Sequence, residues 1–183
     1  MDYKSIAVFC GSKSGSNPMF EQHASELGTM LGENNITLIY GGGRKGLMGA
    51  VADGVMANGG KVMGVIPELL IGWEQQHLGI TNLQIVADMH SRKKIIYDMC
   101  DAAIILPGGF GTLDELFEIL TWNTLKIHDK KIILLNTAGF YNNIIAHINQ
   151  MEQSGFLYEK WTDRIEVCDS PQAIFDSLGV SKH

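Results

Sequence analysis

The chain has 183 residues and a net charge of −6, and 45% of its residues are hydrophobic against 19% charged. This length and composition predict a single globular domain over residues 1–183, with a well-formed core. The acidic balance provides no basic face, so we expect no binding to nucleic acid.

The sequence indicates neither a targeting signal nor a metal motif. The N-terminal apolar stretch is too short for a signal peptide, and no segment reaches the roughly 18 apolar residues that cross a membrane. Cys10, Cys100 and Cys168 lack the CxxC spacing of zinc sites. We therefore expect a cytoplasmic protein with buried thiols, with no membrane partner, no metal ion and no other cofactor.

Seven short apolar runs recur along the chain, most of them separated by segments of helix length. Their hydrophobicity is nearly continuous, as expected of parallel strands covered on both faces. The pattern predicts an α/β fold, a doubly wound, Rossmann-like and mostly parallel sheet of about seven strands with helices on both faces. The predicted strands are residues 6–9, 36–40, 61–66, 83–87, 102–107, 131–136 and 164–168.

The segments between the runs carry apolar stripes at helical spacing, and each stripe is able to pack on the sheet. The stretch 67–82 lacks such a pattern, so we expect a loop with a short helix that borders a site. The stripes are Phe20, Ala24, Leu27 and Leu31; Leu47, Val51 and Val55; and Leu113, Leu116, Phe117 and Leu120.

Three predicted strands end in glycine-bearing loops, and open α/β sheets bind ligands at the carboxyl ends of their strands. We expect the three loops to line one crevice, although glycines also serve ordinary turns. Neither the P-loop nor the G-x-G-x-x-G fingerprint is present. The loops begin with Gly11 and Ser12; with Gly41, Gly42 and Gly43; and with Gly108, Gly109, Phe110, Gly111 and Thr112.

The third loop leads into a predicted helix with Asp114 and Glu115 in its first turn. Two interpretations of Thr112 and Glu115 stay open. T-x-x-E before an apolar stripe is typical of a capping box, in which both side chains satisfy backbone donors. Alternatively, the helix start binds an anion and Glu115 has a chemical role.

Arg92 interrupts an apolar stripe on the next candidate helix, for which Asp88 is the predicted N-cap. An isolated arginine usually packs its stem and extends its head into water, so a functional role is the alternative. Lys93 and Lys94 are predicted to be solvated, with Lys94 spaced for an ion pair with Asp98.

Glu74 and His77 lie in the irregular stretch, where polar side chains are more often solvated than functional. With no neighbouring cluster of ligands, they predict no metal site. Ser12 lacks the G-x-S-x-G elbow of serine hydrolases.

Three motifs in this order resemble the Lonely Guy (LOG) family, the cytokinin riboside 5′-monophosphate phosphoribohydrolases. They are YGGGRKGLMG (40–49), MHSRK (89–93) and PGGFGTLDE (107–115), and the similarity runs from IAVFCGS to about residue 168. Sequences of this kind also carry the label lysine decarboxylase. This sequence does not support that label, because none of its lysines lies in a recognisable pyridoxal phosphate motif.

The resemblance implies an N-glycosyl hydrolase that cleaves an N6-modified AMP to the free base and ribose 5-phosphate. It implies a homodimer with active sites near the subunit interface. By the matching motifs, Arg92 and Glu115 are catalytic, and Lys93, Glu74 and Thr121 bind substrate. One departure is Ile80, which stands where the family has leucine after Gly79.

These residues suggest a mechanism in which the 5′-phosphate rests on the amides of residues 109–112. Glu115 then stabilises the oxocarbenium-like sugar, orients water or binds ribose hydroxyls. Arg92 either neutralises the phosphate or holds the departing purine. Two other functions stay open: a nucleosidase of broader specificity for AMP or other nucleoside monophosphates, and a nucleotide-binding sensor that does not cleave its ligand.

Overall fold

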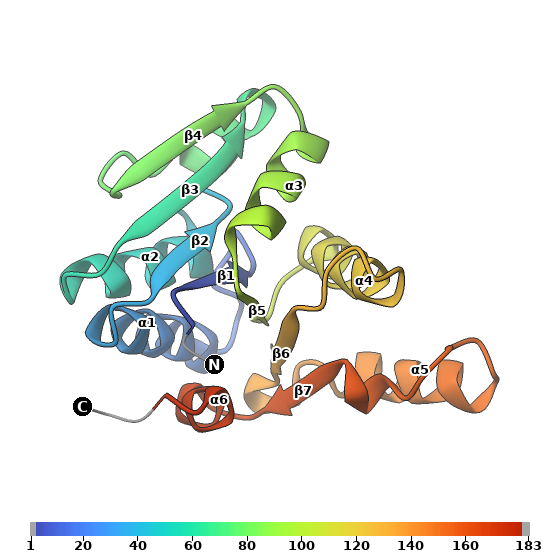
Figure 1. The fold of residues 1–183 in the computed structure, drawn as a ribbon. Coiled ribbons are helices and arrows are strands. Elements are labelled where there is room, and N and C mark those ends of the chain that lie inside the picture. The colour runs from blue at the N-terminus through green and yellow to red at the C-terminus, as the bar shows by residue number, and fades with distance from the viewer. Residues whose placement is uncertain (1–2, 181–183) are drawn as a thin grey trace.

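A parallel sheet of seven strands forms the centre of the protein in the computed structural model, which describes residues 3–180 (Figure 1). Every pairing between neighbouring strands is parallel, so the predicted fold class is confirmed. The strands are β1 (Ser5–Phe9), β2 (Thr37–Tyr40), β3 (Val62–Pro67), β4 (Asn82–Val86), β5 (Ala102–Ile105), β6 (Lys131–Leu135) and β7 (Ile165–Cys168).

Each of the seven apolar runs overlaps one of these strands, with ends that differ by at most two residues. The order across the sheet is β4-β3-β2-β1-β5-β6-β7. The direction of winding therefore reverses between β1 and β5. In open α/β sheets, such a switch point opens a crevice at the carboxyl ends of the strands.

Helices cover both faces of the sheet (Figure 1). The irregular stretch 67–82 contains short helices, as predicted, but no regular α-helix. The α-helices are α1 (Pro18–Glu33), α2 (Gly46–Ala57), α3 (Met89–Met99), α4 (Phe110–Thr124), α5 (Asn142–Gln153) and α6 (Pro171–Leu178), and the shorter helices are η1 (Glu68–Leu70), η2 (Ile71–Gln75), η3 (Thr137–Gly139) and η4 (Trp161–Asp163).

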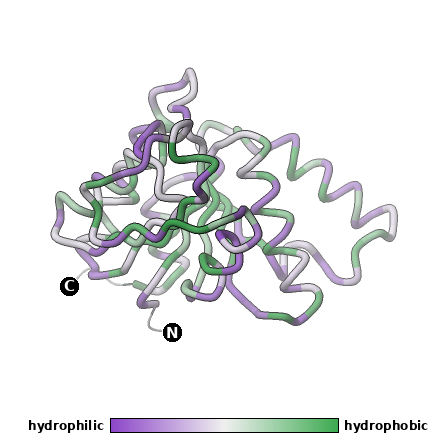
Figure 2. Tube along the Cα trace, turned by 90° about the horizontal axis from the view of Figure 1, so that it is seen from above, coloured by the Kyte–Doolittle hydropathy of each residue, from purple (hydrophilic) through white to green (hydrophobic). Residues whose placement is uncertain are grey.

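Alternate side chains of one strand enter two separate cores. Ile6 and Val8 of β1 pack in the core formed with α1, α2 and α6, whereas Ala7 and Phe9 pack in the core formed with α3, α4 and α5. This arrangement explains why the strand sequences are apolar throughout. Figure 2 shows hydrophobic segments through the middle of the trace and alternating colours along the helices.

Helices α1 and α2 approach each other closely, because glycines remove side chains from their contact. A Cβ on Gly28 would lie 2.2 Å from the Val51 carbonyl oxygen, and a Cβ on Gly54 would lie 2.7 Å from the Ser25 carbonyl oxygen. Since backbone atoms on both sides are fixed in helices, no side chain fits there. The pair places Gly46, the first residue of α2, beside the loop that follows β1.

Candidate functional site

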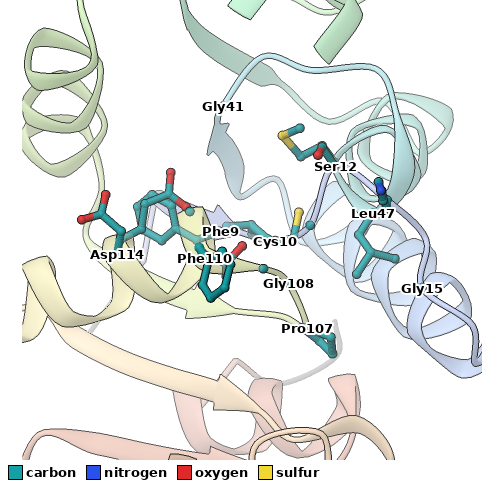
Figure 3. A pocket seen from close by; sticks show the side chains of 18 of the residues that line it. Phe9, Cys10, Ser12, Gly15, Gly41, Leu47, Pro107, Gly108, Phe110 and Asp114 are labelled. Atoms are coloured by element: carbon teal, nitrogen blue, oxygen red, sulfur yellow. The ribbon is translucent and has the colours of Figure 1, made fainter. Parts of the chain in front are cut away.

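A cavity of about 550 Å³ lies at the carboxyl ends of β1, β2 and β5, at the switch point of the sheet. Its volume is in the range of small-molecule sites. The prediction that three glycine-bearing loops line one crevice is confirmed, and Figure 3 shows Ser12, Gly41 and Gly108 around it. Its lining includes Cys10, Gly11, Ser12, Lys13, Gly41, Leu47, Met48, Leu70, Met89, Arg92, Gly108, Gly109, Phe110, Gly111, Thr112, Asp114 and Glu115.

Backbone hydrogen bonds join the three loops. The Gly11 N–H donates to the Pro107 carbonyl at 3.0 Å, and the Leu47 N–H donates to the Gly11 carbonyl at 3.1 Å. Gly46 has a φ of +57°, and a Cβ on it would lie 2.4 Å from the backbone nitrogen of Lys13. The floor of the cavity is therefore a connected backbone surface.

Helix α4 begins at the cavity with Phe110, and Gly109 is its N-cap. The first intrahelical bond runs from the Leu113 N–H to the Gly109 carbonyl at 3.1 Å. The amides of residues 109–112 precede that bond, so they carry the partial positive charge of the helix start. The arrangement favours an anion at this end of the cavity.

The capping-box interpretation of Thr112 and Glu115 is wrong. Thr112 is buried inside the first turn, and no side chain caps the helix. Because the helix starts three residues earlier than a threonine cap requires, Asp114 and Glu115 lie in the second turn rather than the first. Glu115 is half-buried and lines the cavity.

Arg92 also lines the cavity, where it is only 4% exposed. Its Nη2 donates to the Gly41 carbonyl, at the end of β2, over 3.1 Å. The alternative of an arginine head in water is therefore wrong. Backbone space makes this contact possible, since a Cβ on Gly41 would lie 1.9 Å from Nη2.

Asp88 caps the helix that carries Arg92, as predicted. Its carboxylate accepts a hydrogen bond from the Ser91 N–H at 2.7 Å. This bond lowers the pKa of Asp88, because it stabilises the charged form. The cap fixes the start of α3 one turn before Arg92.

Lys93 is not solvated, and it is not among the described residues that line the cavity. Its Nζ lies 3.1 Å from Asp114 Oδ2 and 3.0 Å from Glu118 Oε2, and its side chain is 14% exposed. The next residue, Lys94, is exposed and pairs with Asp98, which confirms that prediction.

Gly42, Gly43 and Thr121, which were also predicted site residues, are not on the described lining of the cavity. The Gly42 carbonyl accepts from the His77 N–H at 2.9 Å, and Gly43 forms an isolated bridge with Gln76. Both glycines thus attach the segment after η2 to the loop after β2. Thr121 is exposed on α4, and its hydroxyl donates to the Phe117 carbonyl of the same helix at 2.6 Å.

Glu74 belongs to η2, and its side chain is outside the part of the structure that is described. The expectation of a solvated His77 is wrong, because the residue is buried. Its Nδ1 accepts from the Gly79 N–H, so the neutral ring donates from Nε2 to Asp53 at 3.0 Å. Among the described residues, no group of three or more His, Cys, Asp or Glu is placed to hold a metal ion.

Several features of the lining were not predicted from the sequence. Gly41 belongs to a loop that was expected to line the crevice, but its contact with Arg92 was not predicted. Met89 lies on the same helical stripe as Arg92, which is the signal that identifies it. The remaining apolar lining, from Phe20, Leu47, Met48, Leu70 and Phe140, comes from helices and short turns far apart in the sequence.

Comparison with known proteins identifies relatives over most of the chain. A family model described as "possible lysine decarboxylase" matches residues 48–178. The cytokinin riboside 5′-monophosphate phosphoribohydrolase LOG1 of Arabidopsis thaliana is 45% identical over 155 residues, which cover 85% of this chain and 73% of the relative. The phosphoribohydrolase of the same description from Rhodococcoides fascians is 40% identical over 166 residues, covering 90% and 84%.

The fold also occurs in more distant solved structures. The molybdenum cofactor carrier protein MCP from Chlamydomonas reinhardtii superposes with a TM-score of 0.73 at 18% identity, covering 96% of this chain and 95% of that one. At this identity, the likeness concerns the fold alone. No helix among the described residues has the length and apolar character needed to cross a membrane.

Replacing Gly41 by alanine tests how Arg92 is placed. Because the new methyl group meets the movable end of a side chain, we expect the protein to fold and the guanidinium to leave the Gly41 carbonyl. A crystal structure of Gly41→Ala checks this, with thermal unfolding as a check on the fold. An unchanged bond from Arg92 to residue 41 would contradict it.

Proposed function

Because the chain belongs to the LOG family of cytokinin riboside 5′-monophosphate phosphoribohydrolases, we propose that it hydrolyses the N-glycosidic bond of an N6-modified AMP. The products are the free base and ribose 5-phosphate. One observation supports this most strongly: the start of α4, Arg92 and Glu115 share one cavity. They provide, in turn, a place for a phosphate, a fixed cation and a carboxylate.

The 5′-phosphate of the substrate binds at the start of α4 in this proposal. The N–H groups of residues 109–112 concentrate partial positive charge at the start of α4, where Thr112 adds a hydroxyl. Gly11 and Ser12, in the loop after β1, line the same cavity. A phosphate held in this way anchors the nucleotide, and its binding energy positions the scissile bond.

Glu115 then faces the ribose. It is three residues beyond Thr112, which places it about 4.5 Å further along the axis of α4. As the glycosidic bond breaks, positive charge develops on the sugar, and a carboxylate stabilises that charge. The same carboxylate is suited to orient the attacking water or to bind ribose hydroxyls.

Arg92 supplies the compensating cation. Its buried guanidinium donates a hydrogen bond to the Gly41 carbonyl, at the carboxyl end of β2. Glu115 lines the same cavity. It either neutralises the phosphate or holds the purine as it leaves. Glu74 and Thr121 are proposed to bind substrate on the strength of the family motifs.

A lysine decarboxylase is disfavoured by the site. Enzymes of that chemistry bind pyridoxal phosphate through a lysine Schiff base. Among the described lining residues the lysine is Lys13, an exposed residue of the loop after β1. A carboxylate beside a helix start fits the names of the relatives instead.

We further propose that one domain of residues 1–183 carries the activity and assembles as a cytoplasmic homodimer. Two large exposed apolar side chains, Met89 and Phe110, line the cavity, and this favours a protein partner there. Leu69, Trp73 and Phe117 are further exposed apolar side chains of the η1, η2 and α4 segments. Sedimentation velocity on the purified protein tests this, since a monomer at micromolar concentration would contradict the dimer.

The substitution Glu115→Gln tests the catalytic role. We expect at least about 100-fold lower turnover with an unchanged fold, because the amide keeps the shape of the side chain and loses its charge. Release of ribose 5-phosphate from AMP and from N6-isopentenyl-AMP measures the effect, and circular dichroism checks the fold. The exposed acid Asp98, changed to asparagine, is the matched control.

The same assay with GMP and CMP distinguishes the alternatives. Cleavage of all four nucleotides at similar rates would replace the N6-specific hydrolase by a broader nucleosidase. If calorimetry shows that AMP binds but no ribose 5-phosphate is released, the protein is a nucleotide sensor rather than an enzyme. Near-wild-type turnover of Glu115→Gln would remove Glu115 from the mechanism.

A further inference from the structure

Two pairs of adjacent charged residues face each other across α3 and α4. Arg92 and Lys93 are consecutive on α3, and Asp114 and Glu115 are consecutive on α4. Arg92, Asp114 and Glu115 line the cavity, whereas Lys93 does not appear on its described lining. Lys93 and Asp114 contact each other at 3.1 Å.

The Lys93–Asp114 contact belongs to a cluster of four side chains. Lys93 also lies 3.0 Å from Glu118 Oε2, and the Tyr97 hydroxyl donates to the same oxygen at 2.9 Å. Lys93 and Tyr97 are one turn apart on α3, as Asp114 and Glu118 are on α4, so two helix rows meet. We call Lys93, Tyr97, Asp114 and Glu118 the α3–α4 clamp.

Burial of Lys93, Tyr97 and Glu118 makes their part of the clamp more rigid than a surface ion pair, whereas the Asp114 side chain is 60% exposed. The side chains of Lys93 and Glu118 are 14% and 22% exposed, and Tyr97 is fully buried, with its ring edge-on to Phe9 and Trp122. Desolvation acts to lower the pKa of Lys93, but its bonds to Glu118 and Asp114 raise it overall. Lys93 therefore stays charged.

Tyr97 contributes a permanent donor to the clamp. Burial, and then the hydrogen bond to Glu118, raise the pKa of its phenol far above the usual value. The hydroxyl therefore stays protonated and keeps donating. Glu118 receives donors from Lys93 and Tyr97 on the same oxygen, which fixes α4 against α3.

The clamp determines where the neighbouring residues point. Successive side chains on an α-helix project about 100° apart. Holding Lys93 against α4 therefore turns Arg92 toward the cavity, and holding Asp114 against α3 does the same for Glu115. We propose that Lys93 is a positioning residue. Through the contacts of the α3–α4 clamp it orients Arg92 and Glu115 toward the cavity, and it neutralises the charge of Asp114 at the edge of the cavity.

This inference rests on the proposed function, and it changes the role that the family motif suggests for Lys93. It also assigns a task to Asp114. A bare carboxylate beside the amides of residues 109–112 would repel a phosphate. Paired with Lys93, Asp114 holds α4 in place without opposing the substrate.

The substitution Lys93→Met tests the proposal. Without the cation, Asp114 and Glu118 repel each other one turn apart, and Asp114 faces the phosphate site uncompensated. We expect AMP to bind about 10-fold more weakly, and kcat to fall about 10-fold or more because Arg92 and Glu115 are misplaced. Calorimetry measures the first effect and ribose 5-phosphate release the second.

Three further variants separate positioning from substrate contact. Lys94→Met removes the adjacent lysine and its ion pair with Asp98, and should leave both quantities unchanged. Lys93→Arg should retain both within about 3-fold, because it keeps the charge. The charge-free variant Lys93→Met/Asp114→Asn/Glu118→Gln should regain AMP affinity, because no unpaired carboxylate is left to repel the phosphate. Its kcat should stay low, because the ion pairs that orient Arg92 and Glu115 are still missing.

Wild-type values for Lys93→Met would overturn the proposal, as would a Lys93→Arg variant as defective as Lys93→Met. If Lys93→Met does not fold, Glu118→Gln replaces it, and is expected to weaken AMP binding and turnover in the same direction. Absence of turnover in the wild-type protein would overturn the proposed function instead. The AMP affinities of the variants would still decide the role of Lys93.

Discussion

The start of α4 at Phe110 is the feature on which the rest of the site depends. Gly109 caps the helix without a side-chain bond, so the amides of residues 109–112, all of which line the cavity, are not taken up by a threonine cap. The same start places Glu115 in the second turn, beyond the amides along the axis. A helix capped by Thr112 would use both side chains of the T-x-x-E motif on its own backbone. Because the observed N-cap lies three residues earlier, both side chains are available to a site that holds an anion and a carboxylate together.

Close backbone approach also shapes the cavity at the carboxyl end of β2. Gly41 has no side chain where the guanidinium of Arg92 lies, and the loop after β1 bonds to the loops after β2 and β5. The switch point between β1 and β5 brings these segments together, since parallel strands end at one edge of the sheet. The order of the strands therefore creates the cavity, and the absence of side chains on the glycines keeps it open.

The fold was predictable because strand and helix patterns are local. All seven apolar runs overlap strands, and the Asp88 cap and the Lys94–Asp98 pair also follow from short-range spacing. The errors concern contacts between distant segments. Burial of Arg92 depends on Gly41, and burial of Lys93 depends on acids of α4, so neither follows from the helix that carries it. The start of α4 was misjudged because a capping box and an anion-binding helix start share the same residues.

The central claim is a division of labour, with backbone amides for the anionic end of the nucleotide and one carboxylate for its sugar. A crystal structure of the Glu115→Gln variant with AMP tests it most directly, because the variant is expected to retain the uncleaved substrate. The account predicts phosphate oxygens within hydrogen-bonding distance of the amides of residues 109–112, and residue 115 against the ribose. A phosphate bound elsewhere in the cavity, or a residue 115 that does not touch the sugar, would contradict it.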